Sequence, residues 1–240
     1  MHRLNASSPR HTARLVLAAI ALLSLGAGDL LAASLRGKVT YEGPEVRRRA
    51  IRMNADPNCE KLHDEHVLQD DKIIGENGEL ANVFVYVEGV PPGGPYEAPE
   101  KAAELRQEGC MYQPKVQGVL VQQDLDVIND DPTLHNVRCL ARENRPFNLG
   151  QPAEGKRTKF FTKPEKAIKF KCDVHPWMAS YIFVMEHPFF DTTGPDGSFE
   201  ISGLPPGEYT VVAWHEIFGE RRTEIEVAAD GAATSFTFTE

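Results

Sequence analysis

The sequence lacks a long hydrophobic run and has little positive charge. Its most apolar stretch, LVLAAIALLSL at residues 15–25, has 11 residues, whereas a membrane-spanning helix needs roughly 20 apolar residues. Lysine and arginine number 26 against 35 aspartates and glutamates, so the net charge is −9. These features argue against an ordinary membrane span and make nucleic acid an unfavourable partner.

The motifs of common hydrolases and nucleotide-binding enzymes are missing too. The chain contains no G-x-S-x-G, no phosphate-binding glycine loop and no H-E-x-x-H. Its carboxylates occur in charged runs, which are typical of a solvated surface. The absence of these motifs argues against a hydrolase and directs attention to the sulfur and imidazole side chains.

Residues 1–33 have the pattern of an export signal. Three arginines precede the apolar run, and Ala32 and Ala33 offer a cleavage point. Retention as an uncleaved anchor is the alternative, although Asp29 interrupts the run. Cleavage would change the net charge from −9 to −11, because three arginines and one aspartate are lost. We therefore expect a periplasmic or secreted protein, without a membrane span after cleavage, in which disulfides can form.

The remaining sequence is dominated by short period-2 patterns. The stretch NVFVYVE at 82–88 alternates valines with larger side chains, and turn signals such as NDDP, GPDG and LPPG separate many similar stretches. This predicts an all-β fold made of sandwiches. Only residues 98–109 are predicted to form a helix, with Pro99 near its start. The polar region 141–157 is predicted to be a surface loop.

The distribution of the strands predicts an interrupted domain. Residues 34–100 supply about two good strands, too few for a sandwich, and residues 189–240 supply about four. Together they would form one small sandwich. Residues 101–188, with a net charge of +2, would form a second domain inserted into the first or packed on it.

Two turns of the outer segments carry a resemblance. Residues 196–199 read DGSF, and residues 204–209 read LPPGEY. Both turns are similar to marks of the carboxypeptidase regulatory-like (transthyretin-like) β-sandwich. The resemblance implies a domain that binds or scaffolds rather than catalyses.

The stretch KCDVHPWMAS, residues 171–180, brings three soft metal ligands together. Cys172, His175 and Met178 lie within seven positions, and a short loop can fold them around one ion. Two imidazoles, one thiolate and a weak axial thioether form the ligand set of electron-transfer copper sites. His135, in NDDPTLHNV, is the candidate for the second imidazole.

These stretches resemble the cupredoxins, the blue copper proteins, over roughly residues 110–187. The resemblance implies a Greek-key sandwich with one type 1 copper. His135, Cys172 and His175 would be equatorial ligands, and Met178 would be axial. The resemblance further implies that Asn136 hydrogen-bonds across residues 172–178, termed the ligand loop.

The same resemblance implies one-electron transfer rather than catalysis, with a redox partner such as a c-type cytochrome. We also expect Trp177 to lie exposed beside the copper. A partner could dock there, and electrons could enter through His175.

The other cysteines leave alternatives open. Cys139 can be a buried inert thiol, a disulfide partner or a competing ligand. Cys59 and Cys110 each lie just outside a predicted strand, which suggests a bridge between them. A second metal site at Cys59, His63 and His66 is a weaker possibility.

Other functions also fit the pattern. The protein could be a Cu(I) carrier or sensor, or a copper enzyme with an open coordination position if Met178 does not bind. A structural adhesion protein ranks last. The plain alternative for the stretch KCDVHPWM is that Cys172 is half of a disulfide, His175 a surface residue and Met178 a core filler.

Overall fold

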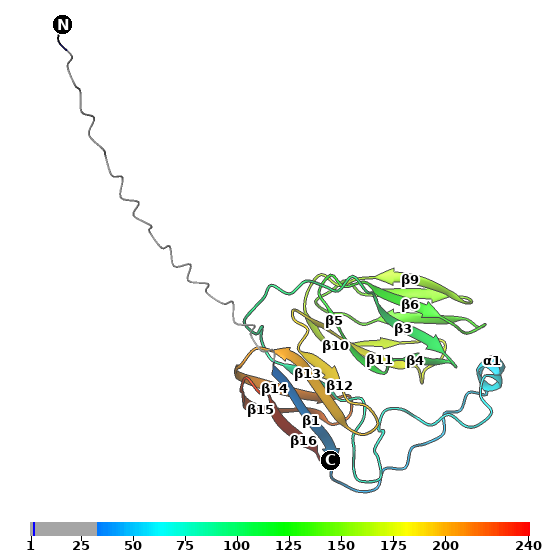
Figure 1. Cartoon of the computed structure of the whole chain (residues 1–240). Helices are drawn as coiled ribbons and strands as arrows, with labels where there is room; N and C mark the ends of the chain where they lie inside the picture. Colours follow the sequence, from blue (N-terminus) through cyan, green and yellow to red (C-terminus); the bar gives the residue numbers. More distant parts are fainter. Residues whose placement is uncertain (1, 3–32) are drawn as a thin grey trace. The chain divides into compact units, whose positions relative to one another are not determined.

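The structure is a computed structural model that describes residue 2 and residues 33–240. The predicted export signal therefore lies almost wholly outside the described residues. Within them, the chain consists of many strands and one short helix (Figure 1), which confirms the predicted all-β fold. No helix in this part of the chain has the length and apolar character needed to cross a membrane.

The two ends of the described chain build a pair of sheets around one core, termed the first sandwich. The sheet orders are β13-β1-β16 and β12-β2-β14-β15. Leu35 and Val39 of one sheet share this core with Val85 and Val211 of the other. The strands are β1 (Ala33–Tyr41), β2 (Phe84–Val87), β12 (Phe190–Thr192), β13 (Ser198–Leu204), β14 (Gly207–His215), β15 (Gly219–Val227) and β16 (Ala232–Phe238).

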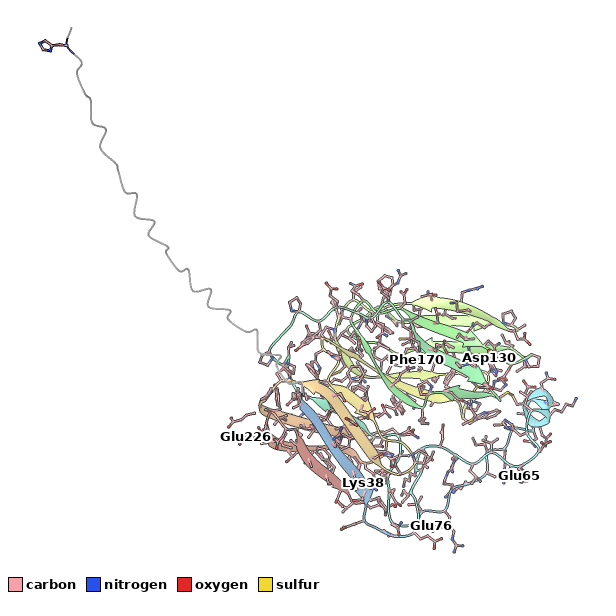
Figure 2. All side chains as sticks on the ribbon, in the orientation of Figure 1. Lys38, Glu65, Glu76, Asp130, Phe170 and Glu226 are labelled. Atoms are coloured by element: carbon pink, nitrogen blue, oxygen red, sulfur yellow. A yellow bond between two sulfur atoms is a disulfide. The ribbon has the colours of Figure 1, made fainter. Side chains whose placement is uncertain are left out.

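The middle of the chain builds a second pair of sheets, termed the second sandwich. The orders are β5-β11-β10-β7-β8 and β4-β3-β6-β9. Phe170, labelled in Figure 2, is fully buried in its core. The strands are β3 (Ala103–Glu108), β4 (Met111–Gln113), β5 (Val116–Leu120), β6 (Leu125–Asn129), β7 (His135–Cys139), β8 (Phe147–Gln151), β9 (Gly155–Lys159), β10 (Glu165–Lys171) and β11 (Ala179–Met185).

Alternate side chains of strand β2 pack into two different buried clusters. Val85 and Val87 face the core of the first sandwich. Phe84 and Tyr86 point to the other face, where they form a separate cluster with Phe183 of β11. The rings of Phe84 and Phe183 stack with centroids 4.1 Å apart. Both faces of β2 are therefore buried, and the aromatic face connects the two sandwiches.

The segment between β1 and β2 carries the helix α1 (Pro57–Lys61). Figure 1 shows α1 beside the ends of β3 and β4. Ile51, Met53 and Cys59 are buried in the core of the second sandwich. A segment that the predicted boundary at residue 100 assigns to the first sandwich thus contributes to the second.

The predicted helix at residues 98–109 is wrong, because this region contains β3. Leu105 and Gln107 are fully buried, and their neighbours are more exposed. The strand pairs in parallel with β6 and antiparallel with β4. Alanine, leucine, arginine and glutamate are good helix formers, but such intrinsic preferences amount to less than about 1 kcal/mol per residue, and tertiary pairing outweighs them here.

The predicted surface loop at residues 141–157 is also wrong. It contains β8 and the start of β9, and β8 pairs along its whole length with β7, from His135↔Gln151 to Cys139↔Phe147. Because β8 is the edge strand of its sheet, exposed polar side chains are tolerated along it. This position accounts for the polar sequence that suggested a loop.

Two buried histidines serve packing rather than chemistry. His215 is 1% exposed, its Nδ1 accepts the backbone N–H of Ile217 at 3.2 Å, and its ring stacks on Phe218. His187 accepts the N–H of Phe189 in the same way. Burial lowers the pKa of His215 from 6.5 to about 4. The charges of Lys115 and Lys72 lower this pKa further, and the charge of Asp71 opposes them.

We expect His215 to make the fold sensitive to acid. The folded state holds this imidazole neutral, whereas the unfolded chain takes up its proton below pH 6.5. Above pH 6.5 the titration of His215 therefore costs the fold no stability. As the pH falls from 6.5 toward 4, it lowers the free energy of unfolding, by roughly 3 kcal/mol at most. Urea unfolding at several pH values measures this loss. His215→Asn keeps an acceptor that does not titrate, so an equal pH slope in that variant would contradict the assignment.

Candidate metal centre

The ligand loop is a tight connection between β10 and β11. The backbone N–H of Cys172 donates to the carbonyl of Met178 at 3.2 Å, and the N–H of Met178 donates to the carbonyl of His175 at 3.0 Å. The N–H of His175 points at the sulfur of Cys172, 3.3 Å away. These contacts fold residues 172–178 back on themselves and direct Cys172 and His175 toward one place.

His135 reaches the same place from the first position of β7. Strand β7 pairs with β10, and Lys171, the residue before Cys172, lies opposite Arg138. The metal-binding atoms of His135, Cys172 and His175 lie within 4.8 Å of one another. All three side chains are at most 2% exposed. The structure therefore brings together the two histidines and the cysteine that the sequence indicated.

Each imidazole is held from behind by a carboxylate. Asp131 Oδ2 lies 2.7 Å from Nε2 of His135, and Asp56 Oδ2 lies 3.1 Å from Nε2 of His175. Burial raises the pKa of each carboxyl group, but hydrogen bonds from the histidines, from backbone N–H groups and, for Asp56, from Thr133 outweigh it, so both pKa values are lowered. An ionised carboxylate can only accept, and each Nε2 therefore carries a hydrogen.

The opposite ring nitrogens consequently face each other. Nδ1 of His135 and Nδ1 of His175 are 2.9 Å apart. Two neutral rings in this orientation would present two lone pairs to the same point, which is favourable only when a proton or a metal cation lies there. The pKa of His135 is raised to about 9, because the hydrogen bonds to Asp131 and Cys172 outweigh burial, whereas burial lowers the pKa of His175. The pair therefore holds a proton readily between its two Nδ1 atoms, at the place where a metal cation could replace it.

Cys172 is prepared for the thiolate form. Burial alone raises the pKa of its thiol, but the hydrogen bond to His135 and those from the backbone near Asn136, Val174 and His175 outweigh it, so the pKa is lowered. A metal-binding cysteine must lose its proton. The surroundings of Cys172 thus favour the form that binds metal.

Asn136 joins β7 to the ligand loop. Its Oδ1 accepts the backbone N–H of Asp173 at 2.7 Å and lies 3.3 Å from the sulfur of Cys172. Its Nδ2 donates to Asn148 at 2.7 Å. The hydroxyl of Tyr112 donates to the carbonyl of Asn136. Asn136 therefore spans the loop beside Cys172 and is itself fixed from two other strands.

Met178 and Trp177 complete the loop. Met178 is fully buried within the core of the second sandwich. Trp177 is half-buried, its ring lies 5.1 Å from that of His175, and its Nε1–H donates to the carbonyl of Cys110 at 2.9 Å. His175 itself is 1% exposed, so a docked partner would contact its neighbours rather than its own edge. Trp177 is the more accessible of the two rings.

A groove of about 1280 Å³ runs beside Trp177. One part of its lining comes from the chain before α1, including Arg49 and Arg52, and another comes from α1 and the chain after it, including Glu60 and Glu65. Figure 2 labels Glu65 on this segment. The groove offers a route from solvent to the ring that lies against His175.

The remaining cysteines are settled by the structure. Cys59 and Cys110 form a disulfide, which confirms the suggested bridge. The predicted alternative of a second metal site at Cys59, His63 and His66 is therefore wrong, because Cys59 is already bonded. His63 instead donates to the carbonyl of Gly109 at 2.7 Å.

Cys139 is a free, buried thiol on β7. Burial is the main reason that its pKa is raised to about 11. In the described part of the chain it belongs to no cluster of metal-binding atoms. Of the three alternatives, the buried free thiol is the one that the structure supports.

Two functional residues were missed in the sequence. Asp131 lies four positions before His135, and that spacing could have suggested a carboxylate partner. Asp56 lies 119 positions before His175, and no local pattern marks it. Asp56 reaches the site only because the segment around α1 packs against the second sandwich.

No protein-family model matches the chain, and no curated protein matches it. Solved structures show partial similarity. A copper-containing nitrite reductase from Thermus scotoductus SA-01 is 22% identical with a TM-score of 0.34, over 41% of this chain and 26% of that protein. A purple cupredoxin from Nitrosopumilus maritimus is 19% identical with a TM-score of 0.30, over 35% and 99%.

A Cu(I) form of an amicyanin variant is 19% identical with a TM-score of 0.32, over 42% of this chain and 98% of that protein. The chain spans about a quarter of the length of the nitrite reductase. Each similarity covers less than half of this chain. The function proposed below therefore rests on the geometry of the site.

Proposed function

We propose that this chain binds one type 1 copper ion through His135, Cys172, His175 and Met178 and carries single electrons. One observation carries the proposal: two Nδ1 atoms and one cysteine sulfur converge in a buried place. The two Nε2 atoms are already occupied by carboxylates. The free donor atoms of both rings are thereby directed at the same point.

The donor set fits copper. Thiolate and thioether sulfur suit Cu(I), and imidazole suits both oxidation states. The lowered pKa of Cys172 makes its thiolate available, and Met178 offers a buried thioether in the same loop. Bound copper would supply a one-electron couple between Cu(II) and Cu(I).

The protein's own contribution is to hold these donors and to exclude water. The loop contacts and Asn136 fix Cys172, while Asp56 and Asp131 fix the imidazoles. With four buried side chains as ligands, no position remains for a substrate. This favours electron transfer over catalysis.

The wider assignments follow from this role. Residues 101–188, together with the segment around α1 that packs into their core, would be the copper domain. The rest of residues 34–100 and residues 189–240 would form a transthyretin-like scaffold. We place the protein in the periplasm or outside the cell, after removal of residues 1–33. Its partner would be a redox protein, such as a c-type cytochrome, that docks near Trp177.

Absorption and EPR spectra of the copper-loaded mature chain test the proposal. An intense thiolate-to-copper band with one copper per chain is the expected result. A colourless protein that binds only Cu(I) would contradict electron transfer and favour a carrier or sensor. Spectral changes on adding azide or nitrite would instead indicate an open coordination position and a copper enzyme.

A further inference from the structure

A distant segment covers the edge of His175 that faces away from Cys172. Asp56 Oδ2 lies 3.1 Å from Nε2 of His175, and the sulfur of Cys59 lies 3.5 Å from the same atom. Together with Trp177, whose ring lies 5.1 Å away, these groups leave His175 only 1% exposed. The imidazole is thus enclosed on the side where solvent would otherwise reach it.

Asp56 is itself held firmly. It is the N-cap of α1, and its Oδ1 accepts the backbone N–H of Asn58 at 2.9 Å. Its Oδ2 accepts the hydroxyl of Thr133 at 3.1 Å in addition to the His175 contact. Thr133, two positions before His135, and His175 therefore both bind the carboxylate of Asp56.

The support of His175 is covalently joined to the support of His135. Cys59 of α1 is bonded to Cys110. The N–H groups of Gly109 and Cys110 each donate to Asp131 at 2.8 Å, and Asp131 holds His135. One disulfide therefore connects the elements that orient the two imidazoles.

We propose that Asp56 is a positioning residue for His175, presented by a disulfide-bonded clasp made of Asp56–Lys61 and Gly109–Cys110. This inference rests on the proposed copper site. The clasp turns Nδ1 of His175 toward Cys172 before any metal arrives. It also keeps water and small external ligands away from the imidazole. Carboxylate partners of this kind orient metal-binding histidines and affect metal affinity.

Chemical modification of the metal-free protein tests the clasp directly. Diethyl pyrocarbonate reacts with accessible imidazole nitrogens, and peptide mass mapping gives the rate for each histidine. In the wild type we expect His175 to react far more slowly than exposed His66. In Asp56→Asn this protection should be weakened, because a neutral amide oxygen accepts the Nε2 hydrogen less strongly than a carboxylate does.

The matched control is Asp64→Asn. Asp64 is an exposed acid in the same segment, so its replacement makes the same change of charge without touching His175. The control should leave His175 protected. Asparagine is as good an N-cap as aspartate, so Asp56→Asn should keep α1. If its circular dichroism shows unfolding, Thr133→Val replaces it. This variant removes one of the bonds that hold Asp56, so it should weaken the protection of His175 in the same direction but less strongly.

Copper binding gives a second readout. Asp56→Asn should weaken copper affinity about 10- to 100-fold and change the EPR hyperfine splitting, whereas Asp56→Glu should restore part of both. Full protection of His175 in a folded Asp56→Asn protein would overturn the clasp, whatever the copper spectra show. A wild type without a thiolate-to-copper band would overturn the copper proposal, while the modification rates would still decide the clasp.

Discussion

Replacement of Cys172 by alanine should abolish the intense visible absorption of the copper-loaded protein. That band requires electron donation from a cysteine sulfur to Cu(II), and Cys172 is the only free thiol of the described chain near both histidines. We also expect copper affinity to fall strongly, because the charged donor is lost and only neutral donors remain. Absorption spectra and a competition titration with a copper chelator measure both effects.

Cys139→Ala is the matched control for this prediction. Cys139 is also a buried free cysteine and lies on β7, next to β10, but its pKa is raised rather than lowered, and it lies outside the cluster. The control should keep the band and lose only about 1 kcal/mol of stability, a typical cost of a single substitution. A band that survives in Cys172→Ala and vanishes in Cys139→Ala would show that the wrong sulfur has been assigned.

Removal of the Cys59–Cys110 disulfide should cause the largest loss of stability. The bond closes a loop with a sequence separation of 51 residues. Closing a loop of this length lowers the conformational entropy of the unfolded chain, which stabilises the folded state by about 4 kcal/mol. Urea unfolding of the double variant Cys59→Ala/Cys110→Ala, compared with the oxidised wild type, measures the difference in the free energy of unfolding.

The chemically reduced wild type provides the control for this experiment. It keeps both sulfur atoms in the core and lacks only the bond, so it separates the effect of the cross-link from the loss of packing. We expect it to be nearly as unstable as the double variant. Equal stability of the reduced and oxidised proteins would mean that the segment around α1 stays in place without its bond.

The candidate ligands could be named from the sequence because most of them lie close together in the chain. Cys172, His175 and Met178 lie in one short loop, and His135 is the first residue of a short strand that follows a turn signal. The polar β8 and the helix-like β3 were missed for the opposite reason. Their identity as strands depends on which neighbours they pair with, β7 for one and β4 and β6 for the other.

The sequence by itself determined the all-β class and the spacing of Cys172, His175 and Met178, since side-chain alternation and residue spacing are properties of short stretches. It only suggested the disulfide. Only the tertiary structure decided that Asp56 covers His175 across 119 positions and that Asp131 joins His135 to the disulfide. The approach of distant segments depends on how sheets pair and how α1 packs on the second sandwich. No short sequence pattern predicts which distant segments meet, because their meeting depends on many contacts made elsewhere in the core.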